Sequence, residues 1–351
     1  MSFIEKIKYY KTLFFGALIV LFLLAVYVST LGVANISFGE SLKIIIERVP
    51  LLDRYFFDES IPDTYRTIIW QIRLPRIFLA GLVGMSLSVV GATFQGMFKN
   101  PMADPYVVGV SSGAALGATI AIVIGVERTV LGLGLINLLA FCGAGGTVLM
   151  VYNIARVGNK VPIVTLLLAG IAVSAMLSSV ISVMMIFNRD KIESIVFWVM
   201  GSVAAASWQH VFTLLPVALI GTAIIFFYAK DLNLIMVGDD SAKSLGVDIE
   251  KTKKVLLVLS SIIIAFAVSV SGIIGFVGLI IPHGIRMLVG PDHRVLIPFS
   301  ALGGAIFLIL SDTIARIAIP PTEIPVGAVT AIFGSPYFIY LLYRTKKKVM
   351  Y

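Results

Sequence analysis

The sequence predicts an all-α polytopic membrane protein with about ten transmembrane helices, both termini in the cytoplasm, and short re-entrant or interfacial helices between spans. Of the 351 residues, 59% are hydrophobic and only 13% are charged, whereas about 25% are charged in soluble domains. The mean hydropathy is +1.02, and one bilayer crossing takes roughly 20 apolar residues. A cytosolic enzyme and a secreted disulfide scaffold are excluded. Residues 1–351 are expected to form a single transmembrane domain.

The first apolar run covers residues 12–34 and follows Lys6, Lys8 and Lys11, as the apolar part of a secretory signal would. A cleaved signal has an apolar stretch of only about 7–15 residues. The run is longer than that and matches the thickness of a bilayer. We therefore interpret it as an uncleaved first span.

Further runs without Asp, Glu, Lys or Arg predict the remaining spans. The run 255–285 exceeds one bilayer crossing and carries Gly272, Gly275 and Gly278 in its middle, so we divide it into two spans there. The apolar piece 195–206 is only half a span long and is interpreted as an interfacial or re-entrant helix. After the first span the predicted runs are 77–98, 106–126, 130–155, 161–187, 211–229, 255–285, 295–311 and 324–343.

The positions of the basic residues predict the orientation in the membrane. An even number of spans returns both termini to one side, and the alternation of loops puts most of the 27 Lys and Arg residues on that side. The positive-inside rule makes this side cytoplasmic, with the chain in the cell (inner) membrane. The net charge of +8 is thus largely topological and requires no nucleic acid partner. Arg73, Arg76 and Arg316 break the trend, because they fall at the predicted outer ends of spans.

Two polar segments are longer than a tight turn. The outer segment, 35–66, mixes acidic and basic residues, and we expect a short helix and a loop there. The inner segment, 230–254, is divided by Gly238 and Gly246 into a short helix-turn-helix. A compact amphipathic element of this size is a candidate contact for a partner protein, and a plain solvated loop is the alternative.

Motifs for nucleotide, metal and nucleophile chemistry give little support for catalysis. The chain contains neither G-x-x-x-x-G-K-[ST] nor H-E-x-x-H, and its three histidines have no Cys or carboxylate at metal-ligand spacing. We expect no metal site, no cofactor and no catalytic residue. The segment 109–113 matches G-x-S-x-G, so Ser111 with His283 defines an intramembrane hydrolase hypothesis. That motif needs a strand-to-helix turn, whereas these residues enter a predicted helix, which favours helix packing.

Small residues recur at spacings that allow helices to approach closely, because lipid tails supply no hydrophobic drive for helix association. A tightly packed bundle is therefore predicted. The single cysteine, Cys142, lies in an apolar run and is expected to be a small buried hydrophobe. The small residues are Gly81, Gly84, Gly91, Gly96, Gly113, Gly117, Gly143, Ala144, Gly145, Gly146, Gly303 and Gly304.

Ionisable residues are nearly absent from the predicted spans. Asp312 lies near the outer end of one span and four residues before Arg316, so the two side chains could neutralise each other, and this question stays open. A proton-coupled pump usually carries buried carboxylates or histidines along its path. Their scarcity argues against a proton relay in this chain and indicates that energy enters from elsewhere.

Seven stretches, in order along residues 65–343, resemble the FecCD-type permease subunits of binding-protein-dependent ABC importers for ferric siderophores, haem and cobalamin. Each stretch alone is a weak match, and their common order makes the resemblance specific. They are 71–76, 98–114, 166–170, 244–246, 275–283, 292–294 and 323–327.

This resemblance implies a homodimer with the translocation path on its two-fold axis. Two separate ATP-binding cassette subunits would bind ATP and magnesium on the cytoplasmic side, and a bilobed substrate-binding protein would dock outside. The implied cargo is an iron chelate, with a ferric siderophore first, cobalamin or haem next and an oxyanion such as molybdate behind. The alternative class is an ATP-independent secondary transporter or channel, which would transport as an isolated chain.

The resemblance also implies roles for individual residues. Asn100 and Met102 correspond to the cytoplasmic gate, and Arg73, Arg76 and Arg316 to positions that face the binding protein. Before Leu166 the family often has small hydroxyl residues, whereas this chain has Pro162, Ile163 and Val164, so no residue is assigned to a second gate. The segment 238–250 corresponds to the element that couples to the ATPase, with Gly238, Asp239, Ser241, Ser244, Leu245 and Gly246.

Overall fold

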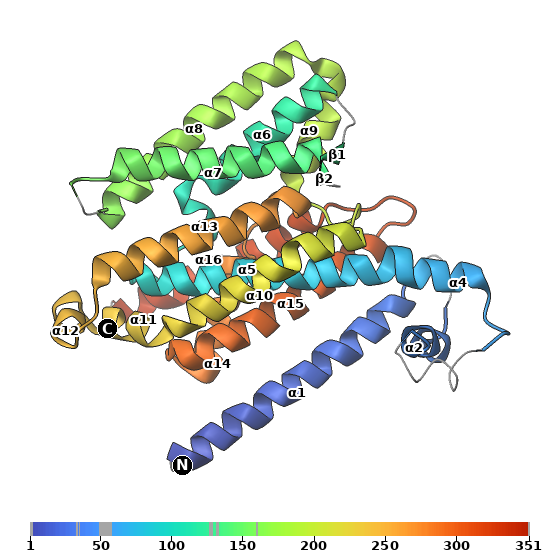
Figure 1. Ribbon diagram of the computed structural model, residues 1–351, viewed down its shortest axis with the longest axis horizontal. Helices are drawn as coiled ribbons and strands as arrows, with labels where there is room; N and C mark the ends of the chain where they lie inside the picture. Colours follow the sequence, from blue (N-terminus) through green and yellow to red (C-terminus); the bar gives the residue numbers. More distant parts are fainter. Residues whose placement is uncertain are drawn as a thin grey trace.

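Helices make up nearly all of the described structure (Figure 1). Each predicted span contains a helix; seven helical segments are long and apolar enough to cross a membrane, and three further apolar helices are shorter. The described strands, Thr129–Val130 (β1) and Leu133–Gly134 (β2), pair in one small hairpin. The predicted all-α polytopic fold is therefore confirmed, and the cytoplasmic location of the termini stays a prediction. The computed structural model describes residues 3–32, 34, 36–48, 58–125, 129–130, 133–158 and 161–349.

The apolar helices differ in length. The long segments are α1 (Phe3–Thr30), α4–η1–α5 (Asp63–Thr67, Ile68–Arg73, Leu74–Met97), α7 (Leu135–Ala155), α8 (Ile163–Phe187), α10 (Trp208–Phe227), α13 (Ile249–Ser271) and α15 (His293–Ile317). The shorter apolar stretches are α6 (Val110–Ile124), α14 (Val277–Val289) and the part Val326–Leu341 of α16 (Val326–Val349). The remaining helices are α2 (Phe38–Ile46), η2 (Pro105–Val108), η3 (Arg189–Lys191), α9 (Ile192–Met200), α11 (Ala229–Val237) and α12 (Asp239–Ser244).

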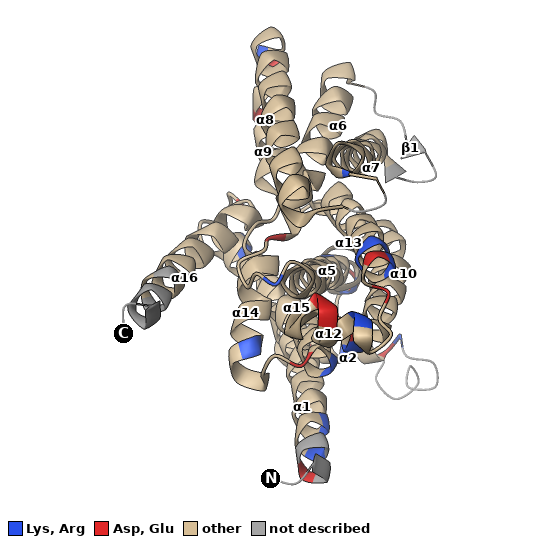
Figure 2. Ribbon diagram, turned by 90° about the vertical axis from the view of Figure 1, so that its left-hand side faces the viewer, with Lys and Arg blue, Asp and Glu red and all other residues tan. Residues whose placement is uncertain are grey.

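Helix α5 is the central element of the bundle, surrounded by α10, α13, α14 and α15 (Figure 2). Within its most apolar window 83% of the residues are buried, against 17% for α1, which lies at the edge. A Cβ atom at Gly91 would overlap the carbonyl oxygen of Gly278 in α14, and one at Gly84 would overlap that of Gly304 in α15. These glycines bring the backbones together and confirm the predicted tight packing.

Helices α6, α7 and α8 form a second layer beside α13 (Figure 1). Gly113 and Gly117 of α6 face the backbone of α7 at Gly143 and Leu139, so the G-x-x-x-G pattern is a packing face. The chain enters α6 at Val110 from a left-handed Gly109 and not from a strand. The geometry of a nucleophile elbow is therefore not present around Ser111.

The connection between α5 and α6 turns back into the bundle, which the sequence did not predict. The side chain of Pro105 lies against Gly278 and beside Leu87 in the middle of α5, about 15 Å before the end of that helix at Met97. The Tyr106 hydroxyl donates to the Ile274 carbonyl at 3.1 Å and accepts from the Ile274 amide at 3.2 Å. Because this segment fills part of the bundle, α6 begins inside it and is short.

The long apolar run 255–285 is two helices, as predicted. Helix α13 ends at Ser271 before Gly272 (φ 66°), and α14 begins at Val277 after Phe276 (φ 69°), so both flanking residues have left-handed backbone conformations. The half-span helix predicted for 195–206 is present as α9, but it covers Ile192–Met200 and residues 201–206 are not helical. It ends before Gly201, where a Cβ would overlap the carbonyl of Ile273 at the break between α13 and α14.

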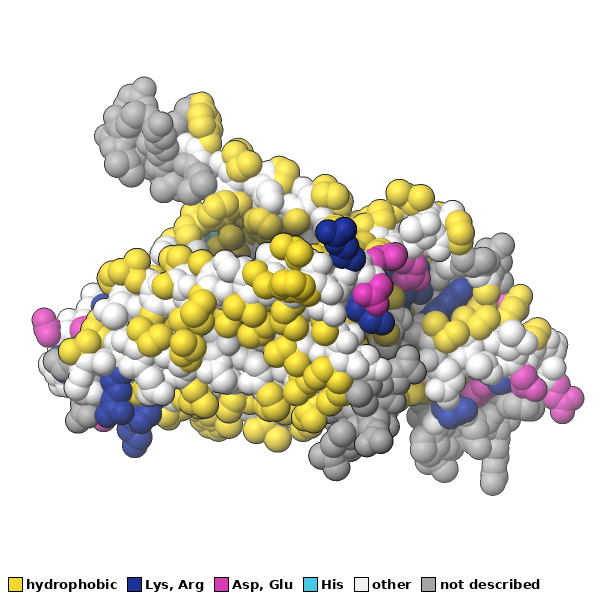
Figure 3. Space-filling model, turned by 90° about the horizontal axis from the view of Figure 1, so that it is seen from above, with side chains coloured by type: hydrophobic (Ala, Val, Ile, Leu, Met, Phe, Trp, Pro, Cys, Tyr) yellow, Lys and Arg dark blue, Asp and Glu magenta, His cyan; other side chains and the backbone are white. Residues whose placement is uncertain are grey.

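Cys142 lies on the outward face of α7 and is exposed, so the expectation of a buried cysteine was wrong. Hydrophobicity alone does not distinguish a helix face that contacts lipid from one that contacts protein, because lipid tails and the protein interior are both apolar. Figure 3 shows hydrophobic side chains spread over the left and middle of one face of the molecule, bounded by basic side chains at the lower left and by a mixed cluster of charged side chains right of the middle. This distribution is that of a surface facing the hydrocarbon of a bilayer.

The two ends of the bundle differ in which elements they carry. Helix α1 begins and α16 ends on the same side of the molecule as α12, and we call this side the α12 end; α2, α4 and the β hairpin lie at the other, the α4 end (Figure 1). The two ends of the described chain thus lie at one end of the bundle, as an even number of spans requires. The expected short helix of the outer segment is α2, and residues 35 and 49–57 of that segment lie outside the described residues.

Candidate functional site

Three arginines meet at a pocket of about 720 Å³ at the α4 end. Arg73 and Arg76 come from one helical segment, in which the π-helix η1 runs directly into α5 and Pro75 occupies its first turn. Arg316 comes from the last turn of α15, and Glu323 from the connection to α16. The sequence placed these arginines at span ends, and the structure brings them together.

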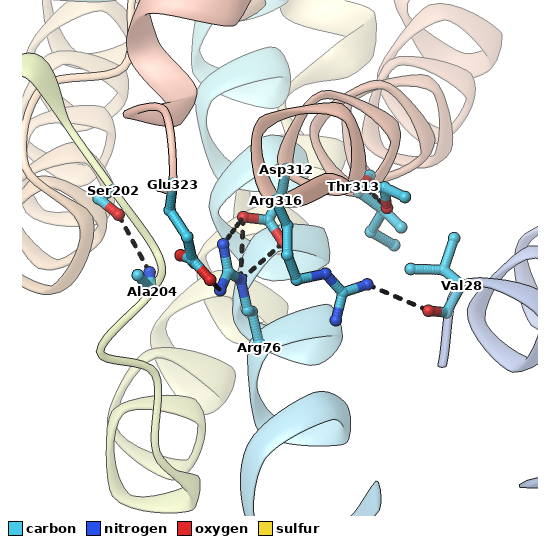
Figure 4. Close-up of polar contacts among 9 residues, drawn as sticks. Val28, Arg76, Ser202, Ala204, Asp312, Thr313, Arg316 and Glu323 are labelled. Atoms are coloured by element: carbon cyan, nitrogen blue, oxygen red, sulfur yellow. Dashed lines mark hydrogen bonds and ion pairs between the residues drawn. The ribbon is translucent and has the colours of Figure 1, made fainter. Parts of the chain in front are cut away.

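Arg76 is neutralised by two carboxylates (Figure 4). Its Nε and Nη2 donate to Asp312 at 2.9–3.1 Å, and its Nη1 donates to both oxygens of Glu323 at 2.9–3.0 Å. The Asp312 side chain is only 4% exposed, whereas that of Glu323 is 40% exposed. The open question about Asp312 is thereby answered, because its carboxylate binds Arg76 and not Arg316.

Arg73 and Arg316 have no carboxylate partner among the described residues. Arg73 is buried and donates to the main-chain carbonyls of Ser29 and Ala34 at 2.6 and 2.7 Å. Arg316 donates through Nη2 to the Val28 carbonyl at 3.1 Å, and its Nε is buried without a partner. Three cations and two carboxylates leave the pocket with a net positive charge. A planar guanidinium in such a place suits bidentate binding of a carboxylate.

Helix α12 forms a small, separately packed projection at the opposite end of the molecule. Its Ala242 packs with Ile235 of α11 and Ile249 of α13 in a core of its own. At its end Gly246 (φ 84°) closes a turn in which the Val247 amide donates to Ala242. Leu245 stays 66% exposed at the tip. The helix-turn-helix predicted for 230–254 is therefore present, with an apolar side chain at its tip.

Asp239 at the start of α12 binds two lysines from other elements. Its Oδ1 accepts from Lys99 Nζ at 2.5 Å, and its Oδ2 accepts from Lys253 Nζ at 3.1 Å. The hydrogen bond from Lys99, with a smaller contribution from Lys253, holds the pKa of Asp239 below its ordinary value. The carboxylate is therefore ionised at neutral pH and connects α12 to the end of α5 and to α13.

The predicted gate residues follow Lys99 directly. Lys99 has a left-handed backbone (φ 52°), the Lys99 amide donates to Gly96 and the Asn100 amide to Gln95, which is a Schellman end to α5. For a residue other than glycine this conformation costs about 1–2 kcal/mol. The Asn100 side chain accepts from the Met102 amide at 2.9 Å and shapes the following turn. Both residues thus lie at the α12 end, and their assignment to the gate stays a prediction.

A family model described as the FecCD transport family matches residues 17–344. The chain belongs to this family. It is 46% identical over 289 residues to the "Cobalamin import system permease protein BtuC" of Halobacterium salinarum, covering 81% of this chain and 75% of the relative. It is 38% identical over 338 residues to the "Hemin transport system permease protein HmuU" of Yersinia pestis, covering 94% and 95%.

The fold of this FecCD chain is also that of a solved relative. A structure described as an inward-facing conformation of a metal-chelate type ABC transporter superposes with a TM-score of 0.81 at 32% identity, covering 95% of this chain and 99% of that one. The FecCD family comprises permease subunits of ABC importers and not their ATPases. This chain is therefore a multi-pass permease of an importer for iron-chelate, haem or cobalamin type substrates.

Sequence reasoning missed the partners of the residues that it named. Glu323 and Lys99 were noted only as parts of matching stretches, and Lys99 lies 140 positions from Asp239. It also missed Asn233 of α11, whose side chain donates to Asp292 at 2.7 Å and accepts from the His293 amide. Hydrogen bonds from the side chain and the main-chain amide of Arg294, with a smaller contribution from the Asn233 side chain, lower the pKa of Asp292 to about 2. No local sequence pattern predicts the pairs Lys99–Asp239 and Asn233–Asp292, because each joins elements far apart in the chain.

Proposed function

We propose that this FecCD permease forms, as a homodimer, the translocation path of an ATP-driven importer in the cell (inner) membrane, with its termini in the cytoplasm. Two separate ATPase subunits bind at the α12 end and supply the energy from ATP and magnesium. An extracytoplasmic binding protein delivers the substrate at the α4 end.

The observation that carries this proposal is that the two ends of the bundle present opposite kinds of surface. The α12 end has a short helix with its own core and an exposed apolar side chain, Leu245, which suits insertion into a groove of another protein. The α4 end has a cationic pocket containing Arg73 and Arg316, which suits capture of carboxylates. One end is thus built for an apolar contact and the other for an ionic one.

The geometry refines the predicted docking residues. Arg76 already binds Asp312 and Glu323, so we assign it to holding α5, α15 and the connection after α15 together. Arg316, which makes a single main-chain hydrogen bond, is then the cation most available to carboxylates of the binding protein, and the buried Arg73 adds positive charge beneath it. Two-fold symmetry would place these cations on both sides of the path, one set for each lobe of the partner.

We propose a metal chelate as cargo and keep ferric siderophore, cobalamin and haem as the candidates. The sequence favoured a siderophore, and the two named relatives are described for cobalamin and hemin. The test is stimulation of ATP hydrolysis in the reconstituted complex by the binding protein loaded with each ligand in turn. The ligand that stimulates hydrolysis and is taken up is the substrate.

The coupling role is tested by Leu245→Asp, with Lys243→Gln in the same short helix as the control. A buried charge in the ATPase groove should lower ATP-driven uptake at least about tenfold, while the isolated chain keeps its unfolding temperature because Leu245 is exposed. Wild-type uptake by Leu245→Asp would remove α12 from the coupling interface. Uptake by the isolated wild-type chain without ATPase would instead support the ATP-independent class.

A further inference from the structure

The end of α5 is joined to α12 by a single side chain. Lys99 Nζ lies 2.5 Å from Asp239 Oδ1, and these residues are 140 positions apart. The other oxygen of the same carboxylate binds Lys253 of α13. Asp239 is therefore shared between the turn that ends α5 and a helix of the bundle.

The backbone at Lys99 is unfavourable for a lysine. Both α5 and α12 end in the same Schellman turn, which requires a left-handed residue. In α12 this position is Gly246 (φ 84°), whereas in α5 it is Lys99 (φ 52°). Glycine adopts this conformation freely and would close the turn without strain. We therefore attribute the lysine at this position to the ion pair that its side chain makes with Asp239.

Stability does not account for that side chain. Lys99 and Asp239 are 36% and 41% exposed, and an exposed ion pair contributes little to the stability of a fold. It therefore offsets little of the strain in the turn. What the pair does supply is a fixed spacing between two elements that have no other hydrogen bond or ion pair between them among the described residues.

The turn that Lys99 begins is connected to the interior of the bundle. Gln95, whose carbonyl accepts from the Asn100 amide, donates through its side chain to the Leu279 carbonyl of α14 at 3.0 Å. Beyond Met102 the chain runs back to Pro105 against Gly278. A displacement of α12 acting on Lys99 would thus reach residues 99–104 and the start of the re-entrant segment.

We propose that Lys99 is a positioning residue that transmits movement of α12 to the gate segment 99–104 through its ion pair with Asp239. This inference rests on the proposed function, in which the ATPase moves α12 and Asn100 and Met102 line the gate. Lys253 binds the other oxygen of the same carboxylate and so connects α12 to α13.

A distance measurement tests the link without any partner protein. In a Cys142→Ser background, spin labels on cysteines at Met102 and Ser241 report the spacing between the gate segment and α12. Lys99→Gly keeps the turn and removes the ion pair, so the distance distribution should broaden about twofold or more, whereas Lys99→Arg should keep it narrow. The matched control is Lys253→Gln, which removes a cation from the same carboxylate and should change this distance less. An unchanged distribution in Lys99→Gly would overturn the proposal.

Uptake per ATP hydrolysed tests the consequence in the complete transporter. Lys99→Gly and Lys99→Asn should lower this ratio about two- to fivefold, the range expected for losing one exposed ion pair, and Lys99→Arg should restore most of it. Neither substitution should weaken ATPase binding, and Lys99→Gly should not lower the unfolding temperature. A lysine that served only the fold would instead leave this ratio unchanged in Lys99→Gly, because glycine closes the same turn without strain. Wild-type coupling in Lys99→Gly would also overturn the proposal. Failure of the wild-type chain to support ATP-driven uptake would refute the proposed function. The distance measurement would still show whether the ion pair of Lys99 with Asp239 fixes the gate segment relative to α12.

Discussion

At the scale of single residues, the arginines at the α4 end differ in how their charge is balanced. Arg76 has two carboxylate partners, one of them almost fully buried, whereas Arg73 and Arg316 donate to main-chain carbonyls. Three residues that look alike in the sequence therefore have different surroundings. Substitution should separate their roles.

We expect Arg76→Ala to be the most destabilising of the three substitutions. It leaves Asp312 as an uncompensated buried charge, and breaking a buried ion pair costs about 3–5 kcal/mol. Thermal unfolding of the purified chain in detergent measures this loss. The control is the double variant Arg76→Leu with Asp312→Leu, which removes both charges and should recover much of the stability. A single variant as stable as the wild type would show that the ion pair does not hold these helices together.

Arg316→Ala should weaken docking of the binding protein at least tenfold with a smaller effect on folding. Truncating a desolvated arginine–carboxylate pair costs about 2–5 kcal/mol, and charge reversal to Glu should be worse. Binding to the reconstituted chain should also weaken with added salt. Lys191→Ala, an exposed cation paired with Asp190, is the matched control. Unchanged docking by both Arg73→Ala and Arg316→Ala would make these arginines structural.

The Asp239 carboxylate should stay ionised over the physiological pH range. Because its pKa in the folded chain lies below the ordinary value of 3.8, its ion pairs stabilise above that value and are lost only as the pH falls below it. Uptake measured between pH 5.5 and 8 should therefore show no transition that disappears in Asp239→Asn. If uptake did change between pH 5.5 and 8, and Asp239→Asn abolished that change, Asp239 would not be ionised throughout this range as we expect.

At the scale of elements, close backbone contacts decide how α5 sits in the bundle. Its glycines meet Gly278 and Gly304 where no side chain fits, whereas Gly145 and Gly146 of α7 have open space around them. The sequence pattern treated all of these glycines alike. Only the geometry shows which of them are packed against a neighbour.

Gly91→Ala should therefore destabilise the chain, and Gly145→Ala should not. The added methyl group at Gly91 overlaps the Gly278 carbonyl, and overpacking of this kind costs about 1–3 kcal/mol or more. The readouts are the unfolding temperature and the yield of folded chain. Equal stability of the two variants would mean that α5 and α14 can separate without loss.

Sequence reasoning recovered most helices but not their tertiary connections. Hydrophobic runs located a helix for every predicted span, and Gly272 predicted the break between α13 and α14. The re-entrant segment at Pro105 was missed, because a short apolar stretch next to a span looks like part of that span. Cys142 was misplaced because lipid-facing and protein-facing residues are equally apolar. The pairs of Arg76 and Lys99 were missed because their partners are remote in the chain.

At the scale of the whole molecule, the arrangement predicts coordinated change between two copies. If the path lies on a two-fold axis, Asn100 and Met102 of both subunits approach each other when the gate is closed. Cysteines at these positions, in the Cys142→Ser background, should crosslink between subunits in one nucleotide state of the transporter and not in another. Crosslinking that is independent of nucleotide would exclude these residues from the gate.

The ion pairs of Arg76 also impose an order on the biosynthesis of the chain. Asp312 lies 236 residues after Arg76, and Glu323 lies 247 residues after it. Translation proceeds at about 5–20 residues per second, so roughly 12–47 s pass before the first of these carboxylates has been made. During that interval the guanidinium has neither carboxylate, and a bare cation is costly in hydrocarbon. The central helix of the bundle, α5, although among the first to be synthesised, therefore reaches its final environment only when α15 has joined it.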